Sequence, residues 1–153
     1  MTIAEQLDEN LRDAMKRRDS ATADVLRMLK SRLQERRTAK GFSGEMDDTV
    51  VRDVIGAYRK QMQKALEELE PLGEKAAAQV EKLRFEVAYC DRFLPAAVPE
   101  EELRALVAER IAALGITDPK QAGRVIGEVM KTHRGRVEAA DVKRIAEEIL
   151  SKQ

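Results

Sequence analysis

The side chains that could carry acid–base or nucleophilic catalysis are few in this chain. It contains one histidine, His133, and one cysteine, Cys90, which fall in different predicted domains. Cys90 lies on the apolar side of its predicted helix, which favours a small core residue over a reactive thiol. His133 is expected in a basic loop, where a surface or phosphate-contacting role is favoured over catalysis. The sequence therefore predicts no catalytic residues.

Metal and cofactor sites also lack their usual residues. No second histidine or cysteine is present that could complete a metal site with His133. The phosphate-binding patterns GxxxxGK[ST] and GxGxxG are absent from the sequence. We therefore expect no bound metal, no cofactor, and no ligase, hydrolase or nucleotide-dependent activity from the chain alone.

Two glycines, Gly123 and Gly127, lie four residues apart inside a predicted helix. Each costs about 1 kcal/mol relative to alanine in a helix interior, so a close approach should compensate for the loss. One interpretation is tight packing of another helix against this small-residue side. The other is close approach of a partner's backbone. We favour the first interpretation, and both can hold together.

A local excess of positive charge lies near the C-terminal end of a chain whose formal net charge is zero. Between residues 120 and 144, seven basic side chains stand against three acidic ones. Arg134-Gly135-Arg136 is the most suggestive part, because glycine lets the backbone approach a phosphate while the guanidinium groups contact it. The alternative is a solvated surface. The residues predicted to bind RNA are Lys120, Arg124, Lys131, Arg134, Gly135, Arg136 and Lys143.

A second basic segment lies between Arg12 and Lys40 and includes Lys16-Arg17-Arg18. Acidic residues interleave with it, and it contains no aromatic side chain that could stack on a base. Sequence-specific RNA recognition is therefore not expected. Recognition of the RNA backbone and shape stays open.

The composition predicts that helices position all of these residues. Charged residues make up 37% of the 153 residues and aromatic residues 3%, whereas strands favour aromatic and β-branched residues. Ile3, Leu7 and Leu11 are spaced as in an amphipathic helix rather than a signal peptide. No segment approaches the roughly 20 apolar residues that cross a bilayer. With a single cysteine, we expect a cytoplasmic protein that does not enter the membrane.

Apolar residues at helical spacing predict an all-α fold. Residues 1–94 are expected to form a four-helix N-terminal domain, with Thr2 and Glu5 as a capping box. The third helix has the cleanest apolar stripe, close to a heptad repeat. The helices are predicted at about 3–18, 20–40, 48–69 and 74–92, with the segment from Gly41 to Gly44 ending the second.

Two of the four prolines, Pro95 and Pro99, mark a predicted boundary, because proline disfavours helix in the preceding residue. Residues 95–98 are expected to be a linker, and residues 99–153 a small three-helix tail domain. Its helices are predicted to begin at Pro99, at Asp118-Pro119, and after a polar loop spanning Thr132 to Val137.

Several short segments, taken in their order along the sequence, resemble the YqeY proteins, and the resemblance covers essentially the whole chain. They are Ala14-Met15-Lys16 with Asp19 and Val25-Leu26-Arg27-Met28-Leu29, Phe93-Leu94-Pro95 with Glu100-Glu101-Glu102-Leu103, and Gly123-Arg124-Val125-Ile126-Gly127 with Met130 and Gly135-Arg136. The family often has Ala-Asp-Gly after Gly-Arg, whereas this chain has Val137-Glu138-Ala139.

The resemblance implies a four-helix domain joined to a three-helix tail. The tail is similar to the end of the GatB subunit of tRNA-dependent amidotransferases, which are carbon–nitrogen ligases with glutamine as amido donor. In those enzymes the tail is an accessory tRNA-contacting domain, and the active sites lie elsewhere. The leading hypothesis is therefore a non-catalytic accessory protein that binds tRNA or another structured RNA.

Two other hypotheses stay open. A protein-interaction adaptor, or a dimer, would fit the neutral total charge and the long apolar stripe of the third helix. An amidotransferase-associated component would need partner subunits that carry the active sites. A salt-dependent complex with tRNA would favour the RNA hypothesis, because phosphate contacts release counterions.

Overall fold

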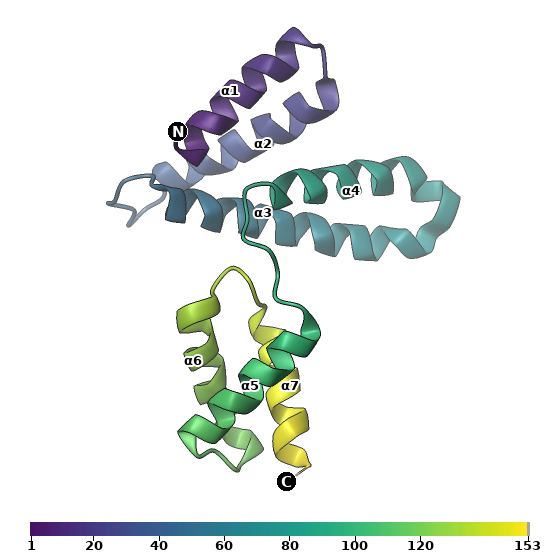
Figure 1. Ribbon diagram of the computed structural model, residues 1–153. Coiled ribbons are helices and arrows are strands. Elements are labelled where there is room, and N and C mark those ends of the chain that lie inside the picture. Colours follow the sequence, from purple (N-terminus) through teal and green to yellow (C-terminus); the bar gives the residue numbers. More distant parts are fainter. Residues whose placement is uncertain (153) are drawn as a thin grey trace. The chain divides into compact units, whose positions relative to one another are not determined.

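The computed structural model describes residues 1–152, which form seven α-helices, two 3₁₀ segments and no strand (Figure 1). The predicted all-α fold is confirmed. The chain divides into two compact units, Met1–Leu94 and Pro95–Gln153. None of the helices within the described residues is both long enough and apolar enough to span a membrane.

The first unit consists of two helical hairpins, α1 with α2 and α3 with α4 (Figure 1). Its core contains Leu7, Leu26, Leu29 and Ile55, all fully buried. Its elements are α1 (Ile3–Lys16), α2 (Ser20–Arg37), α3 (Asp48–Leu69), the 3₁₀ segment Glu70–Ala76 and α4 (Ala77–Asp91).

Local side-chain hydrogen bonds explain where these helices begin. Thr2 and Glu5 form the predicted capping box of α1. Asp19 caps α2 by accepting from the backbone N–H of Thr22, and Asp47 caps α3 in the same manner. The first predicted helix is two residues too long, because Arg18 adopts a left-handed backbone conformation with φ of 56° after Lys16.

The fourth helix begins later than predicted. Pro71 and Gly73 lie in the 3₁₀ segment that precedes it, and Gly73 has a φ of 64°. The helix therefore starts at Ala77 rather than Glu74. Tyr58 of α3 donates a hydrogen bond to the buried Glu86 of α4, at 3.3 Å, and joins the two helices.

The second unit has three α-helices around its own apolar core. Pro99 is the N-cap residue of the first helix rather than its first helical residue. Gly115 ends that helix with a φ of 66°. The elements are α5 (Glu100–Leu114), the 3₁₀ segment Pro119–Gln121, α6 (Ala122–His133) and α7 (Ala139–Ser151). Thr132 and His133 therefore belong to α6. The loop between α6 and α7 is shorter than the predicted loop from Thr132 to Val137.

Residues 95–98, expected to be a linker, form part of the second unit. The backbone N–H of Val98 donates to the carbonyl of Arg136 at 2.9 Å. The Arg136 Nε donates to the carbonyl of Ala96 at 3.3 Å. Val98 also packs against the core of this unit. These contacts hold the segment against the loop between α6 and α7.

Candidate nucleic-acid interface

The outer side of α6 combines basic side chains with glycine. Val125 and Val129 of this helix are fully buried, whereas Arg124, Gly127 and Lys131 are exposed. These three residues lie on one side, because they are spaced by three and four residues along the helix. Together with Gly123 and Lys120 they are called the α6 basic face below.

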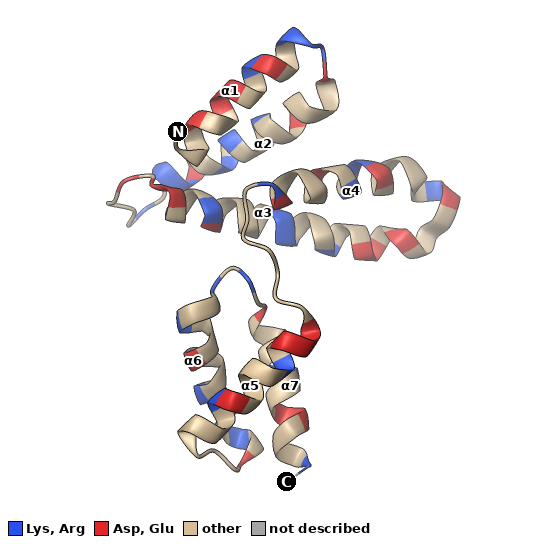
Figure 2. Ribbon diagram, viewed as in Figure 1, with Lys and Arg blue, Asp and Glu red and all other residues tan. Residues whose placement is uncertain are grey.

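The start of α6 positions the first of these residues. Asp118 accepts a hydrogen bond from the backbone N–H of Lys120 at 2.9 Å, within the 3₁₀ turn that leads into the helix. Ala122 is buried directly after this turn. Lys120 and Arg124 are both exposed. Among the charged residues of α6 and of the loop that follows it, basic ones prevail (Figure 2).

The favoured interpretation of the glycine pair is wrong for the part of the chain that the structure describes. A β-carbon added at Gly123 or at Gly127 would meet no atom within 4 Å. Hence no described helix packs tightly on that side of α6. The glycines leave an open strip of backbone on the exposed side of α6, so close approach of a partner is the interpretation that remains.

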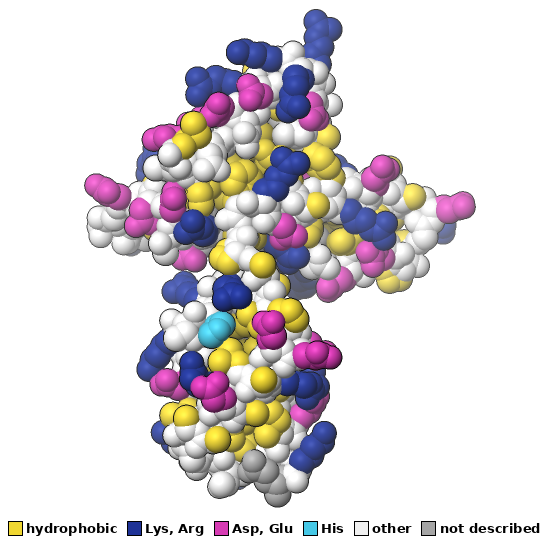
Figure 3. Space-filling model, in the orientation of Figure 1, with side chains coloured by type: hydrophobic (Ala, Val, Ile, Leu, Met, Phe, Trp, Pro, Cys, Tyr) yellow, Lys and Arg dark blue, Asp and Glu magenta, His cyan; other side chains and the backbone are white. Residues whose placement is uncertain are grey.

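The loop after α6 holds the other basic residues of the predicted site. Gly135 has a φ of +84°, a conformation that favours glycine. The backbone N–H of Arg136 donates to the carbonyl of His133, which closes the turn. His133 is the cyan residue in Figure 3. Arg134 and Arg136 are exposed, but Arg136 also holds Ala96, so its guanidinium has a structural role that the sequence did not reveal.

The sequence of this interface belongs to a known family. The family described as Yqey-like protein matches residues 4–150 of the chain. The chain belongs to this family. The match confirms the prediction made from the sequence motifs, and the similarity of the tail to the amidotransferase subunit stays a prediction. No curated protein gives a significant match.

The basic residues of the predicted site in this YqeY-like chain differ in whether an acidic side chain pairs with them. Lys131 forms an ion pair with Glu128 at 2.9 Å, and the hydrogen bond from Lys131 lowers the pKa of Glu128. Such exposed pairs contribute little stability, so Lys131 can exchange Glu128 for a phosphate at small cost. Lys143 is exposed on α7, and the described structure shows no contact that joins it to α6.

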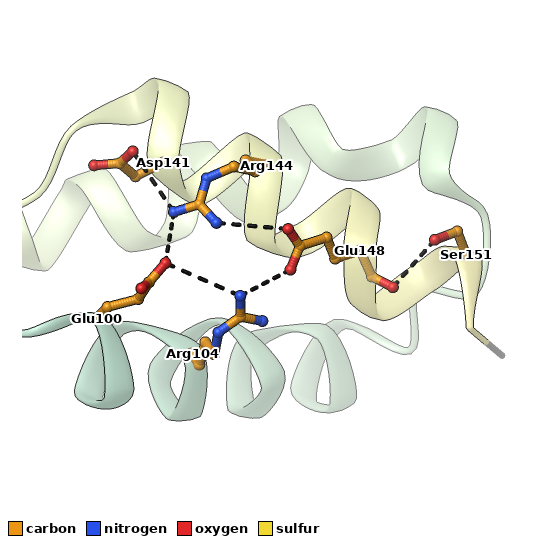
Figure 4. A network of polar contacts seen from close by, with 6 residues as sticks. All are labelled: Glu100, Arg104, Asp141, Arg144, Glu148 and Ser151. Atoms are coloured by element: carbon orange, nitrogen blue, oxygen red, sulfur yellow. Dashed lines mark hydrogen bonds and ion pairs between the residues drawn. The ribbon is translucent and has the colours of Figure 1, made fainter.

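Arg144, which contributed to the positive charge count, is neutralised within the unit (Figure 4). Its guanidinium contacts Glu100 at 2.7 Å, Glu148 at 3.5 Å and Asp141 at 3.8 Å. Arg104 of α5 completes the network with Glu148 at 2.9 Å. The network joins α5 to α7, so the charge of Arg144 belongs to folding rather than to the α6 basic face.

The two residues with catalytic potential occupy different environments. Cys90 is fully buried, and burial is the main cause that raises the pKa of its thiol to about 12. A protonated thiol is a poor nucleophile. His133 ends α6, with its Nδ1 2.6 Å from the Thr132 hydroxyl. Within residues 1–152, no group of three histidine, cysteine, aspartate or glutamate side chains could hold a metal.

The sequence did not reveal a polar pocket in the first unit. Arg17 of the basic N-terminal segment lies there with two aromatic residues of α4, Phe85 and Tyr89. The spacing of these two rings, one helical turn apart, is visible in the sequence. Their position beside Arg17 depends on the packing of α4 against the α1–α2 hairpin, for which the sequence gives no local signal.

Proposed function

We propose that this YqeY-like protein is a non-catalytic accessory protein that binds tRNA or another structured RNA through its second unit. The observation that carries the proposal is the exposed Gly127 between Arg124 and Lys131, with open space above its Cα. In the middle of a helix, an exposed glycine lowers stability without adding packing. An RNA backbone that approaches this strip closely would give it a function.

The chemistry of the face suits the phosphate backbone of RNA. With no side chain at Gly127, a phosphate can come near the helix and meet Arg124 and Lys131 on either side of the open strip. Arg134 and Gly135 of the following loop extend the contact toward a second phosphate. Such contacts recognise the position and shape of the RNA rather than its sequence.

The adaptor hypothesis depended on the long apolar stripe of the third helix, and the structure weakens it there. In the stripe of α3, Val51, Ile55, Tyr58 and Leu66 are buried within the first unit. Most of the stripe therefore has its partners inside the chain and is not presented to another protein. The amidotransferase-associated component stays an alternative that comes from the sequence. The cytoplasmic location is a part of the proposal that also comes from the sequence.

The proposal is tested by measuring the affinity of the full chain for labelled tRNA by fluorescence anisotropy at several salt concentrations. The double variant Arg124→Gln/Lys131→Gln should bind more weakly, and its logarithmic salt slope should fall by about one unit for each phosphate that it no longer neutralises. The matched control, Lys64→Gln/Lys82→Gln, removes the same charge from exposed sites in the first unit. It should change neither quantity by a comparable amount.

A change of opposite sign sharpens this test. Glu128 pairs with Lys131 of the α6 basic face, so Glu128→Gln should release Lys131 and strengthen the binding of tRNA. If the wild type fails to bind tRNA, the proposed function is wrong. If it binds and both α6 variants, Arg124→Gln/Lys131→Gln and Glu128→Gln, behave as the wild type does, RNA is bound elsewhere and α6 is a solvated surface.

A further inference from the structure

A pocket of about 270 Å³ opens within the first unit. Residues from the end of α1, the start of α2 and the C-terminal half of α4 line it. Its volume lies just below the roughly 300–1,000 Å³ of sites for drug-sized ligands. The pocket therefore suits a single ring system rather than a large cofactor.

Two aromatic residues of α4 form one wall of this pocket. The rings of Phe85 and Tyr89 are stacked, with centroids 6.2 Å apart and planes 25° apart. Tyr89 is only 4% exposed, and the guanidinium carbon of Arg92 lies 4.9 Å from the centroid of its ring. Phe85, in contrast, keeps 38% of its surface exposed. Phe85 thus offers an aromatic surface that the fold does not cover.

Hydrogen-bonding groups lie beside the aromatic wall. The Asn10 Nδ2 donates to the Tyr89 hydroxyl at 3.3 Å. Asp13 lies one turn further along α1 and also lines the pocket. Asp19 is already engaged, because it accepts from the hydroxyl and the backbone N–H of Thr22 at 2.7 and 3.2 Å. Asp13 and the part of the Asn10 amide that does not bond Tyr89 are therefore the groups that can meet the polar edge of a ligand.

Positive charge lies at the same pocket. Arg17 comes from the end of α1 and Arg92 from the end of α4, and both line the cavity. Lys16 and the exposed Arg18 flank Arg17 in the turn between α1 and α2. Figure 2 shows this turn as a basic segment. Arg18 holds a left-handed backbone conformation, with φ of 56°, which few residues other than glycine adopt readily.

We propose that this pocket binds an unpaired nucleobase of an RNA strand, with the base stacked on Phe85. Asn10 and Asp13 would contact the polar edge of the base, while Arg17 and Arg92 would contact the flanking phosphates. The proposal deepens the proposed function and rests on it for the class of ligand. The pocket itself lies in the first unit, and none of its lining residues belongs to the α6 basic face of the second unit.

The combination of groups favours a nucleotide over simpler ligands. A small anion would gain from Arg17 and Arg92 but would meet the carboxylate of Asp13 and make no use of Phe85. An organic cation could stack on Phe85 but would be repelled by the two guanidinium groups. A nucleotide joins an aromatic base that carries hydrogen-bond donors to an anionic phosphate, so it can use all of these groups.

The probe for this site is a fluorescein-labelled, unstructured RNA hexanucleotide, titrated into the full chain. Phe85→Leu keeps an apolar side chain over Tyr89 but removes the stacking surface. It should weaken binding at least about fivefold, the lower end for the loss of one base–aromatic stack. Arg17→Gln should lower the salt slope by about 0.7, the value for one phosphate of a single strand. Leu72→Ala, at another exposed apolar site of the unit, should leave binding unchanged.

Backbone amide spectra recorded during the titration locate the site. Shifts should concentrate at the end of α1 and around Phe85 and Tyr89, rather than in α6. If the hexanucleotide does not bind, or binds Phe85→Leu and Arg17→Gln as tightly as it binds the wild type and with the same salt slope, the pocket proposal is overturned, even where tRNA binding still depends on α6. If hexanucleotide binding depends on Phe85 while tRNA binding ignores the α6 variants, the pocket stands and the proposed function of the second unit fails.

Discussion

Replacing Gly127 by alanine should stabilise the second unit. Gly127 lies in the middle of α6, is exposed, and has open space where a β-carbon would be added. Alanine is favoured over glycine in a helix interior by about 0.8–1.0 kcal/mol, with no packing cost at this position to offset the gain. For a unit of this size, 1 kcal/mol corresponds to a rise in Tm of about 4–8 °C.

Calorimetry of the full chain measures this effect in the unfolding transition of the second unit. Ala108→Gly is the matched control, because Ala108 is an exposed residue in the middle of α5. It should lower the Tm of the same transition by a similar amount. Parallel binding measurements with tRNA should show a lower affinity for Gly127→Ala, because the added methyl group keeps the RNA backbone away from the helix.

Two results would contradict this reasoning in different ways. A lower Tm for Gly127→Ala would mean that another part of the protein contacts the glycine closely, against the open space seen in the structure. A higher Tm with unchanged affinity for tRNA would mean that the open strip has no part in RNA binding. A general loss of fold cannot imitate the expected result, in which stability and affinity change in opposite directions.

Three further predictions concern folding and reactivity. Cys90 should resist iodoacetamide at pH 8 in the folded protein and react after denaturation, because burial raises the pKa of its thiol to about 12; rapid labelling of the folded protein would show that the site opens. The hydrogen bond from Arg104 is the main cause that lowers the pKa of Glu148 below its ordinary value of 4.5. The stabilisation from Glu148 is thus complete above that value and lost as the pH falls through the folded pKa. Urea denaturation of Glu148→Gln and wild type should therefore differ at pH 7, and the difference should shrink as the pH falls below 4.5. Arg136→Ala should speed proteolysis at residues 95–98 by removing the hydrogen bond to Ala96, without speeding cleavage within α3; an unchanged rate would show that this bond does not hold the segment.

The helices could be predicted from sequence because their signals are local. Thr2, Asp19 and Asp47 lie a few residues from the backbone groups that they cap. Glycine or proline also lies within two residues after the ends of α3, α5 and α6, at Pro71, Gly115 and Gly135. The errors at Lys16 and Ala77 also have local causes, a left-handed arginine and a 3₁₀ segment. In both places only a few residues depart from α-helical φ and ψ angles, so the predicted helix end is wrong by a few residues.

The candidate sites could be predicted only in part, because they depend on contacts between distant segments. The basic residues of α6 were visible in the sequence, and their exposure follows from the burial of Val125 and Val129. Whether another helix covers the glycines could not be known before the three helices were placed. The pocket brings Arg17 beside Phe85, and no spacing rule relates residues so far apart in the chain.

Charge balance over a whole chain says little about nucleic-acid binding once ion pairs are assigned. The formal net charge is zero, yet Arg144 and Arg104 are neutralised by acidic residues that join α5 to α7. Arg124 faces solvent on α6, beside a strip without side chains. A phosphate responds to charges within about a Debye length, near 8–10 Å at physiological salt, and not to the sum over the molecule. The same network that removes positive charge from α7 therefore leaves α6 as the side of this unit where an RNA backbone would meet basic groups and open backbone together.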